Sequence, residues 1–172
     1  MKQFKKSNFD KFPRINIGGH TCTQGWKNIA DKLQDIINEK GDEKIIVAIE
    51  CYHGVYTAEL AAQFQTHIPS AKLFDASTAM LPDEEIEKMV YPYVTDDPVF
   101  GYMAPLNLSD FFDVKKIAWL QNKVHRVENG ICIVYGIGAT LISPMPGLLV
   151  YADMPRWEIQ LRFRRNSISN IG

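Results

Sequence analysis

Residues 45–60, IIVAIECYHGVYTAEL, carry the clearest signal of the fold class. The first five are apolar and mostly β-branched, which is typical of a strand buried in a parallel sheet. A short loop containing Gly54 follows. From Thr57 onward the apolar residues recur at helical spacing, which places Leu60, Phe64 and Ile68 on one face. A strand, a loop and a helix in this order predict an α/β domain.

This stretch has the frame of a phosphate-binding loop without its phosphate-binding residues. A P-loop follows a strand with the pattern G-x-x-x-x-G-K-[ST] and then opens a helix. If its last residue is placed on Thr57, the two glycines fall on Glu50 and Val55, and the lysine falls on Tyr56. Glu50 adds a negative charge where phosphates would bind, which opposes anion binding. Gly54 and the free N–H groups of the helix still favour one anion, so a small-ligand site and a plain strand–loop–helix junction both stay open.

The flanking sequence predicts alternating helices and strands. Helices are expected over 26–40, 57–68, 83–90, 110–124 and 156–165. Strands are expected over 14–17, 45–49, 71–75, 131–134 and 148–151. The stretch 92–108 is rich in Pro, Gly and aromatic residues and is expected to be irregular. The alternation predicts a three-layer α/β sandwich with a mostly parallel sheet.

Ligands in such sheets bind outside the carboxyl ends of the strands. The segments in which a site is expected are therefore 50–56, 75–80, 135–139 and 152–156. Within them Asp153, just before Met154-Pro155, is expected to cap the helix that follows, and a base or metal-ligand role is the alternative.

Length and composition limit the kind of protein. The 172 residues suffice for one domain, which we assign to 15–166, with a lead-in over 1–14 and the start of a linker over 167–172. The net charge of −1 gives no reason to expect nucleic acid or an anionic membrane as a partner. No apolar run approaches the ~20 residues of a spanning helix. Three widely spaced cysteines without zinc or redox spacing indicate a reducing cytoplasm.

The order of the predicted elements resembles a uridine-kinase-like P-loop fold. Asp75 matches an aspartate that ends the second strand of that family, and Gly136 matches the glycine of a later strand that ends in Glu-Gly. The resemblance implies a P-loop-kinase-like topology. Tyr56 stands at the position of the P-loop lysine and Tyr135 at that of the acidic partner, so the phosphate loop is degenerate.

The same resemblance points to arginines. In that family a strand runs into a helix whose arginines lie near the phosphates, and here the matching segment is 150–165. Arg162, Arg164 and Arg165 fall at those positions, and guanidinium groups bind phosphates bidentately. A solvated helix end that complements the dipole is the alternative. Arg156 opens this helix, where a cation is unfavourable, so we expect it to have a carboxylate or ligand partner.

A second resemblance covers nearly the whole chain. It rests on distinctive motifs at 9–13 (FDKFP), 24–26 (QGW), 50–55 (ECYHGV), 110–113 (DFFD), 134–139 (VYGIGA) and 149–160 (LVYADMPRWEIQ). These are similar to the N-terminal region of long bacterial class I mannose-6-phosphate isomerase-like proteins. The resemblance implies that a cupin isomerase module follows as a partner, and that zinc belongs to that module. No cofactor or metal ligand carries over to this chain.

Two residues are candidates for chemistry. His53 suits general acid–base work or a phosphate contact, or is simply an exposed loop histidine. Asp75 suits a base or metal ligand, or caps a turn. The candidate ligand loop comprises Glu50, Tyr52, His53, Gly54, Thr57, Gly136, Gly138, Arg156, Arg162 and Arg165. We expect no metal site.

We expect a non-catalytic accessory domain of a mannose-6-phosphate isomerase-like protein, which binds a small phosphorylated ligand or stabilises or regulates the isomerase module. One alternative is an active phosphotransferase of nucleoside- or sugar-kinase type with a rearranged site. The other is a pure docking domain.

Overall fold

The computed structural model describes residues 10, 13–14, 18–19, 21–97, 101–169 and 171. The lead-in predicted over 1–14 and the strand predicted over 14–17 therefore lie largely outside the described residues. All other predicted elements fall within them.

Within the described residues, four strands form one sheet, and every pairing among them is parallel. The strands are β1 (Lys44–Cys51), β2 (Lys72–Asp75), β3 (Gly130–Gly136) and β4 (Leu148–Ala152), in the order β2-β3-β1-β4. The register aligns Glu50 with Gly136 on one side of β1 and with Tyr151 on the other. The predicted α/β class with a parallel sheet is confirmed.

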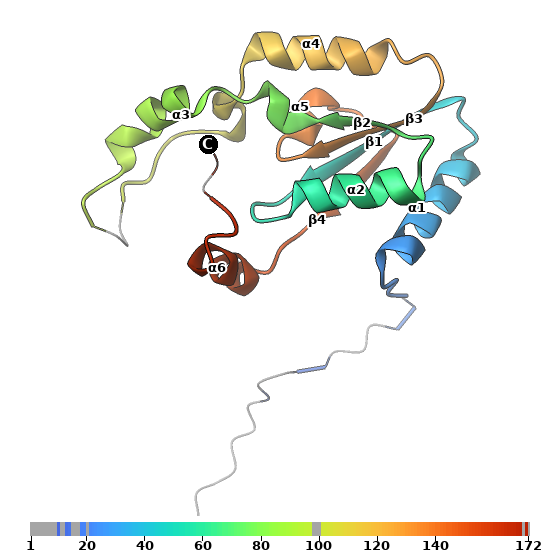
Figure 1. Cartoon of the computed structure of the whole chain (residues 1–172), viewed down its shortest axis with the longest axis horizontal. Helices are drawn as coiled ribbons and strands as arrows, with labels where there is room; N and C mark the ends of the chain where they lie inside the picture. Colours follow the sequence, from blue (N-terminus) through green and yellow to red (C-terminus); the bar gives the residue numbers. More distant parts are fainter. Residues whose placement is uncertain are drawn as a thin grey trace, which may run out of the picture.

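Helices cover both faces of the sheet, which gives three layers. On one face, α1 (Trp26–Lys40) and α2 (Thr57–His67) bury Leu33, Leu60 and Phe64 against the alternate β1 residues Val47 and Ile49. On the other face, α4 (Val114–His125) and the short α5 (Ala139–Ile142) pack on β3 in a second core. Figure 1 shows α4 along its face of the sheet. The β residues alternate between the two cores because strand side chains point to opposite faces.

Local sequence signals set most element ends. α1 ends where Gly41 adopts the left-handed conformation with φ 68°. The helix predicted over 110–124 begins later, because Asp110 accepts the Asn107 N–H and closes a separate 3₁₀ turn, η3 (Leu108–Phe111). Asp113 then caps α4 through the N–H groups of Lys115 and Lys116. The expected cap at Asp153 is wrong, because Pro155 is the N-cap of α6 (Arg156–Arg164).

Between β2 and α4 the chain leaves the sheet as an arm that holds η1 (Ala76–Ala79), α3 (Asp83–Val90), η2 (Tyr91–Tyr93) and η3. Figure 1 shows α3 well away from the strands. A bridge between Met80 and Phe112 closes the base of the arm. Across the described ranges, no helix is long and apolar enough to cross a membrane.

Candidate functional site

The strand order places a crevice between β1 and β3. The chain leaves β1 through α2, on one face of the sheet, and reaches β2 at one edge. It leaves β3 through α5, on the other face, and reaches β4 at the opposite edge. Neighbouring strands whose connections run over opposite faces to opposite edges mark a topological switch point, where α/β folds bind ligands. The predicted segments 50–56 and 135–139 both lie at this crevice.

The Glu50 carboxylate bridges the switch point. One oxygen accepts the Gly138 N–H at 2.7 Å. The other accepts both the N–H and the hydroxyl of Thr140, each at 2.8 Å. Gly138 has φ 80°, and a Cβ there would lie 2.5 Å from Phe112 Cζ, so only glycine fits. Glu50 and Gly138, predicted to be part of a ligand loop, thus bind each other.

A pocket of about 280 Å³ lies beside this bridge, outside the carboxyl ends of β1, β2 and β3. The loop after β1 supplies His53 and Gly54, and the start of α2 supplies Thr57. Ser77 comes from η1 after β2, and Gly136 ends β3. We call it the carboxyl-edge pocket. Four predicted site residues, His53, Gly54, Thr57 and Gly136, therefore line one cavity.

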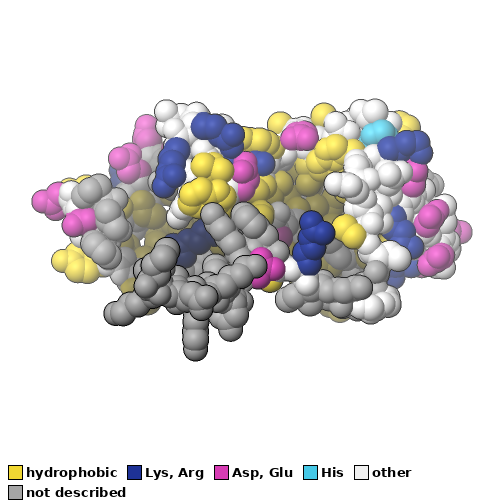
Figure 2. All heavy atoms as spheres, turned by 90° about the horizontal axis from the view of Figure 1, so that it is seen from below, with side chains coloured by type: hydrophobic (Ala, Val, Ile, Leu, Met, Phe, Trp, Pro, Cys, Tyr) yellow, Lys and Arg dark blue, Asp and Glu magenta, His cyan; other side chains and the backbone are white. Residues whose placement is uncertain are grey.

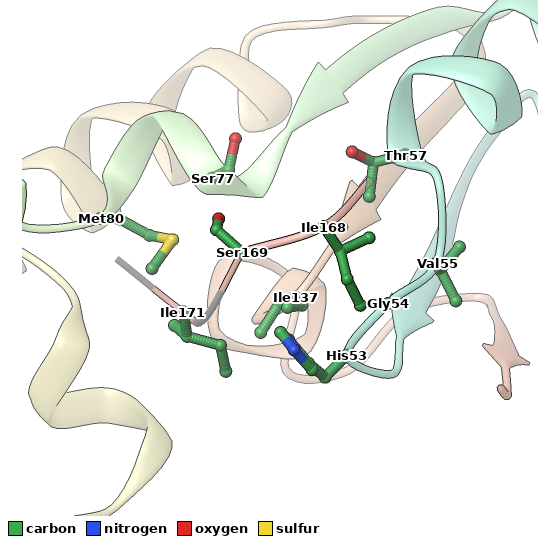
Figure 3. A pocket seen from close by; sticks show the side chains of 11 residues that line it. His53, Gly54, Val55, Thr57, Ser77, Met80, Ile137, Ile168, Ser169 and Ile171 are labelled. Atoms are coloured by element: carbon green, nitrogen blue, oxygen red, sulfur yellow. The ribbon is translucent and has the colours of Figure 1, made fainter. Parts of the chain in front are cut away.

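The C-terminal segment, residues 165–169 and 171, forms the remaining wall. Figure 3 shows Ile168, Ser169 and Ile171 passing between the loop that carries His53 and the turn that carries Ser77. Gly54 has φ 91°, and a Cβ there would approach Ile159 Cγ1 to 3.2 Å and Ile168 Cδ1 to 3.4 Å. Gly54 thus lets this segment and α6 pack closely on the loop. Residues 167–169, predicted to begin a linker, lie against the domain.

The arginines of α6 lie outside the carboxyl-edge pocket. Arg162 donates to Glu158 at 3.1 Å and to the Gly54 carbonyl at 2.6 Å, and its guanidinium stacks on the Tyr56 ring at 3.8 Å. Arg165, just after the helix, donates to Glu158 at 3.0 Å and to the Leu161 carbonyl. Hydrogen bonding to Arg162 lowers the pKa of the Glu158 carboxyl. Arg162 therefore joins α6 to the loop after β1, whereas both bonds of Arg165 go to residues of α6 itself.

The other predicted residues are spread around the carboxyl edge. Asp75 Oδ1 accepts the Ser77 N–H at 2.8 Å and caps η1. Tyr52 is half exposed and donates its N–H to the Ala152 carbonyl. Arg156 is exposed and makes no side-chain hydrogen bond or ion pair with the residues that the structure describes. The partner expected for Arg156 stays a prediction.

A polar cavity of about 370 Å³ continues the carboxyl-edge pocket toward α4. The two share Ser77, Met80 and Ser169. Lys116 lines this second cavity, and its Nζ donates to the Met80 carbonyl at 2.8 Å. Lys116 is thus a cation that sequence reasoning missed, and nothing in its local pattern marks it.

Other lining residues were also missed by sequence reasoning. Ser77 and Met80 lie in the predicted segment 75–80, where Asp75 is the only residue with a predicted role in a site. Ser169 and Ile171 carried no signal, because the segment that holds them was assigned to a linker.

Burial raises the pKa of the Cys51 thiol, at the end of β1, to about 11. The thiol is therefore protonated at neutral pH and is a poor nucleophile. In the part of the chain that is described, no three His, Cys, Asp or Glu side chains gather as metal ligands would.

Comparison with known families places the chain. The family model described as a domain of unknown function, DUF8485, matches residues 25–172, so the chain belongs to that family. The match spans every helix and strand described above. No curated protein matches the chain.

Proposed function

We propose that this DUF8485 domain binds a small phosphorylated ligand in the carboxyl-edge pocket, as an accessory domain of a mannose-6-phosphate isomerase-like protein. The observation that carries the proposal is the position of the pocket, outside the switch point of a parallel sheet and at the N-terminus of α2. The isomerase module and a cytoplasmic setting belong to the same proposal. The three free cysteines favour that setting.

The chemistry of the walls favours an anion of modest charge. Thr57 is the first residue of α2, where N–H groups lack intrahelical partners and the helix dipole is positive. The hydroxyls of Thr57 and Ser77 and the imidazole of His53 add donors. In the adjoining cavity Lys116 adds a positive charge, and Asp83 lines the same cavity with a negative one. A sugar phosphate would suit this arrangement, with its phosphate near Lys116 or the α2 N-terminus.

The side chains around the switch point support ligand binding without phosphoryl transfer. Glu50 keeps a negative charge at the switch point, bonded to Gly138 and Thr140. Tyr56 stands where a P-loop would carry its lysine, and Arg162, stacked on its ring, is bound to Glu158. Phosphoryl transfer needs cations around the transferred group, and here the Arg162 cation already has a carboxylate partner.

Docking onto a partner protein is a second candidate function, and the exposed apolar side chains of the arm favour it. Tyr91, Tyr102 and Met103 are 74%, 71% and 97% exposed, and the Tyr102 N–H donates to the Tyr93 carbonyl, which brings these parts of the arm together. Apolar side chains that gather into one exposed patch are typical of contact surfaces. A pure docking domain would bind no small ligand, which separates it from the first proposal.

Isothermal titration calorimetry with mannose 6-phosphate tests the proposal, with unphosphorylated mannose as the ligand control. Thr57→Val and Lys116→Gln each remove one polar contact and should weaken binding about threefold to tenfold. His67→Gln, at the far end of α2, is the matched control and should leave the affinity unchanged.

Absence of heat with mannose 6-phosphate, glucose 6-phosphate and inorganic phosphate would refute ligand binding and leave docking. Magnesium-dependent turnover of ATP would instead favour the phosphotransferase alternative.

A further inference from the structure

A separate cavity of about 300 Å³ lies on the other side of the β1–α2 loop. Its walls come from the start of α1, the first turn of α2, the loop after β4, and α6. Three motifs that the sequence analysis singled out, at 24–26, 50–55 and 149–160, each contribute lining residues. The proposed phosphate ligand uses none of its acidic residues.

Two carboxylates line this cavity, and each has one oxygen available. Glu59 Oε1 accepts the Trp26 indole N–H at 3.2 Å, and Asp153 Oδ1 accepts the Met154 N–H at 2.8 Å. Glu59 Oε2 and Asp153 Oδ2 accept no hydrogen bond from the described residues. The cavity thus offers two negatively charged acceptors that the fold itself does not use.

The one cation in the described walls does not cancel this charge. Arg162 also lines the cavity, but its guanidinium bonds Glu158 and the Gly54 carbonyl and stacks on Tyr56. Its side chain is only 15% exposed. Glu158 is shared by Arg162 and Arg165 and offsets only part of the Arg162 charge. The cavity still carries more negative than positive charge, because the two carboxylates Glu59 and Asp153 outnumber the one guanidinium and have no cationic partner in the described part of the chain.

The rest of the wall is aromatic and apolar. Of its lining residues, Trp26 and Met154 are half buried and Leu60 is buried. An indole beside two carboxylates suits an organic cation, because the ring face attracts positive charge and the apolar wall covers a carbon chain. A hard metal ion would need more oxygen ligands than these two carboxylates supply.

An ammonium fits better than a guanidinium. A guanidinium binds a carboxylate best through two parallel bonds to both oxygens. Here each carboxylate already uses one oxygen within the fold, so only single contacts are available. An ammonium is compact, carries three donors and makes single contacts to several acceptors.

We propose that this cavity binds a primary ammonium group carried on a short apolar chain. Glu59 and Asp153 accept its N–H groups, and Trp26 and Met154 cover the chain. The site differs from the carboxyl-edge pocket in place and in the sign of the charge it takes.

The test follows the Trp26 indole N–H by ¹⁵N-edited NMR while n-butylammonium chloride is added to the full chain. The signal should shift and saturate with butylammonium, but not with n-butanol at matched ionic strength. Glu59→Gln and Asp153→Asn should each weaken binding about tenfold, the loss expected for one charged acceptor. The Glu59→Gln side chain still accepts the indole N–H, and Asp35→Asn, an exposed acid of α1 outside the cavity, should change nothing.

Nα-acetyl-lysine methylamide separates two sources of the ammonium. Binding of both probes supports a lysine side chain, and binding of butylammonium alone supports a free amine. An equal response to butanol, binding of neither probe, or unchanged affinity in both acid variants overturns the proposal. The mannose 6-phosphate titration is independent, because Glu59→Gln should not affect it.

Discussion

The Glu50 carboxylate itself occupies the crevice between β1 and β3. Its carboxylate meets Gly138 and Thr140 where a phosphate-binding fold would place a ligand. Alignment with a P-loop marks Glu50 as a negative charge where phosphates would bind. A charge at the end of a buried strand needs a partner. The partner was not visible, because it is 88 residues away along the chain.

Glu50→Gln should lower the free energy of unfolding by about 2–4 kcal/mol. The amide keeps one acceptor but presents an NH₂ to an N–H that needs an acceptor. Urea unfolding followed by circular dichroism measures the loss. Glu39→Gln, an exposed acid in the last turn of α1, is the control and should stay within about 0.5 kcal/mol of the parent.

Gly138→Ala should destabilise the domain by about 3 kcal/mol or more, from the left-handed backbone and the overlap with Phe112 together. Gly41 offers a matched control, since it has φ 68° and no atom within 4 Å of an added Cβ. Gly41→Ala should therefore lose only about 1 kcal/mol. Equal losses in urea unfolding would show that the packing against Phe112 does not matter.

Among the elements, α4 shows how a cap sets a helix start. The sequence predicts a helix over 110–124, which would make Asp110 its first residue. The structure differs: Asp110 closes η3 and Asp113 caps α4. Hydrogen bonds from the N–H groups of Lys116 and then Lys115 lower the pKa of the Asp113 carboxyl.

The Asp113 cap should make the free energy of unfolding depend on pH in the acid range. Because its folded-state pKa lies below the unfolded value, the unfolded chain binds the proton more readily. The stabilisation is therefore present above about pH 4 and is lost as the pH falls through the folded-state pKa. Asp113→Asn still caps the helix but does not titrate. Urea midpoints of parent and variant should differ most near about pH 7, and the difference should shrink as the pH falls through the folded-state pKa.

Asp42→Asn, in the exposed turn after α1, is the control for that experiment, and its midpoint should follow the parent at both pH values. A constant gap between parent and Asp113→Asn across the pH range would contradict the assignment.

Across the molecule as a whole, the C-terminal segment joins α6 to the loop after β1. The Tyr56 hydroxyl donates to Ser167 Oγ at 2.9 Å, and Ser167 in turn donates to the Arg162 carbonyl. The same segment walls the carboxyl-edge pocket. Charges of both signs are interspersed over the face seen from below in Figure 2, as the net charge of −1 leads one to expect.

Tyr56→Phe should loosen this segment without unfolding the domain. Loss of one neutral hydrogen bond should speed trypsin cleavage after Arg164 or Arg165 about threefold, as followed by mass spectrometry. Tyr91→Phe, which changes an exposed tyrosine of the arm, should leave the rate unchanged. An unchanged rate in Tyr56→Phe would mean that the bond to Ser167 does not hold the segment.

The class of the fold and most of its elements follow from the order of amino acids alone. The helix over 26–40 follows from helical periodicity, the strands around 45–49, 131–134 and 148–151 follow from short apolar runs, and Gly41 marks a helix end. These signals are local, because helical and strand spacing depend only on near neighbours along the chain. Four of the predicted ligand residues also meet in one pocket, because carboxyl ends of parallel strands share an edge.

The order β2-β3-β1-β4, and everything that depends on it, emerges only in the folded chain. That order sets Glu50 beside Gly138 and brings Lys116 and the C-terminal segment to the carboxyl edge. It also gathers Trp26, Glu59 and Asp153 around the separate cavity on the other side of the β1–α2 loop. Strand order depends on how the two helical layers pack on the sheet. That packing joins residues far apart in the chain, and no periodicity within a segment reports it.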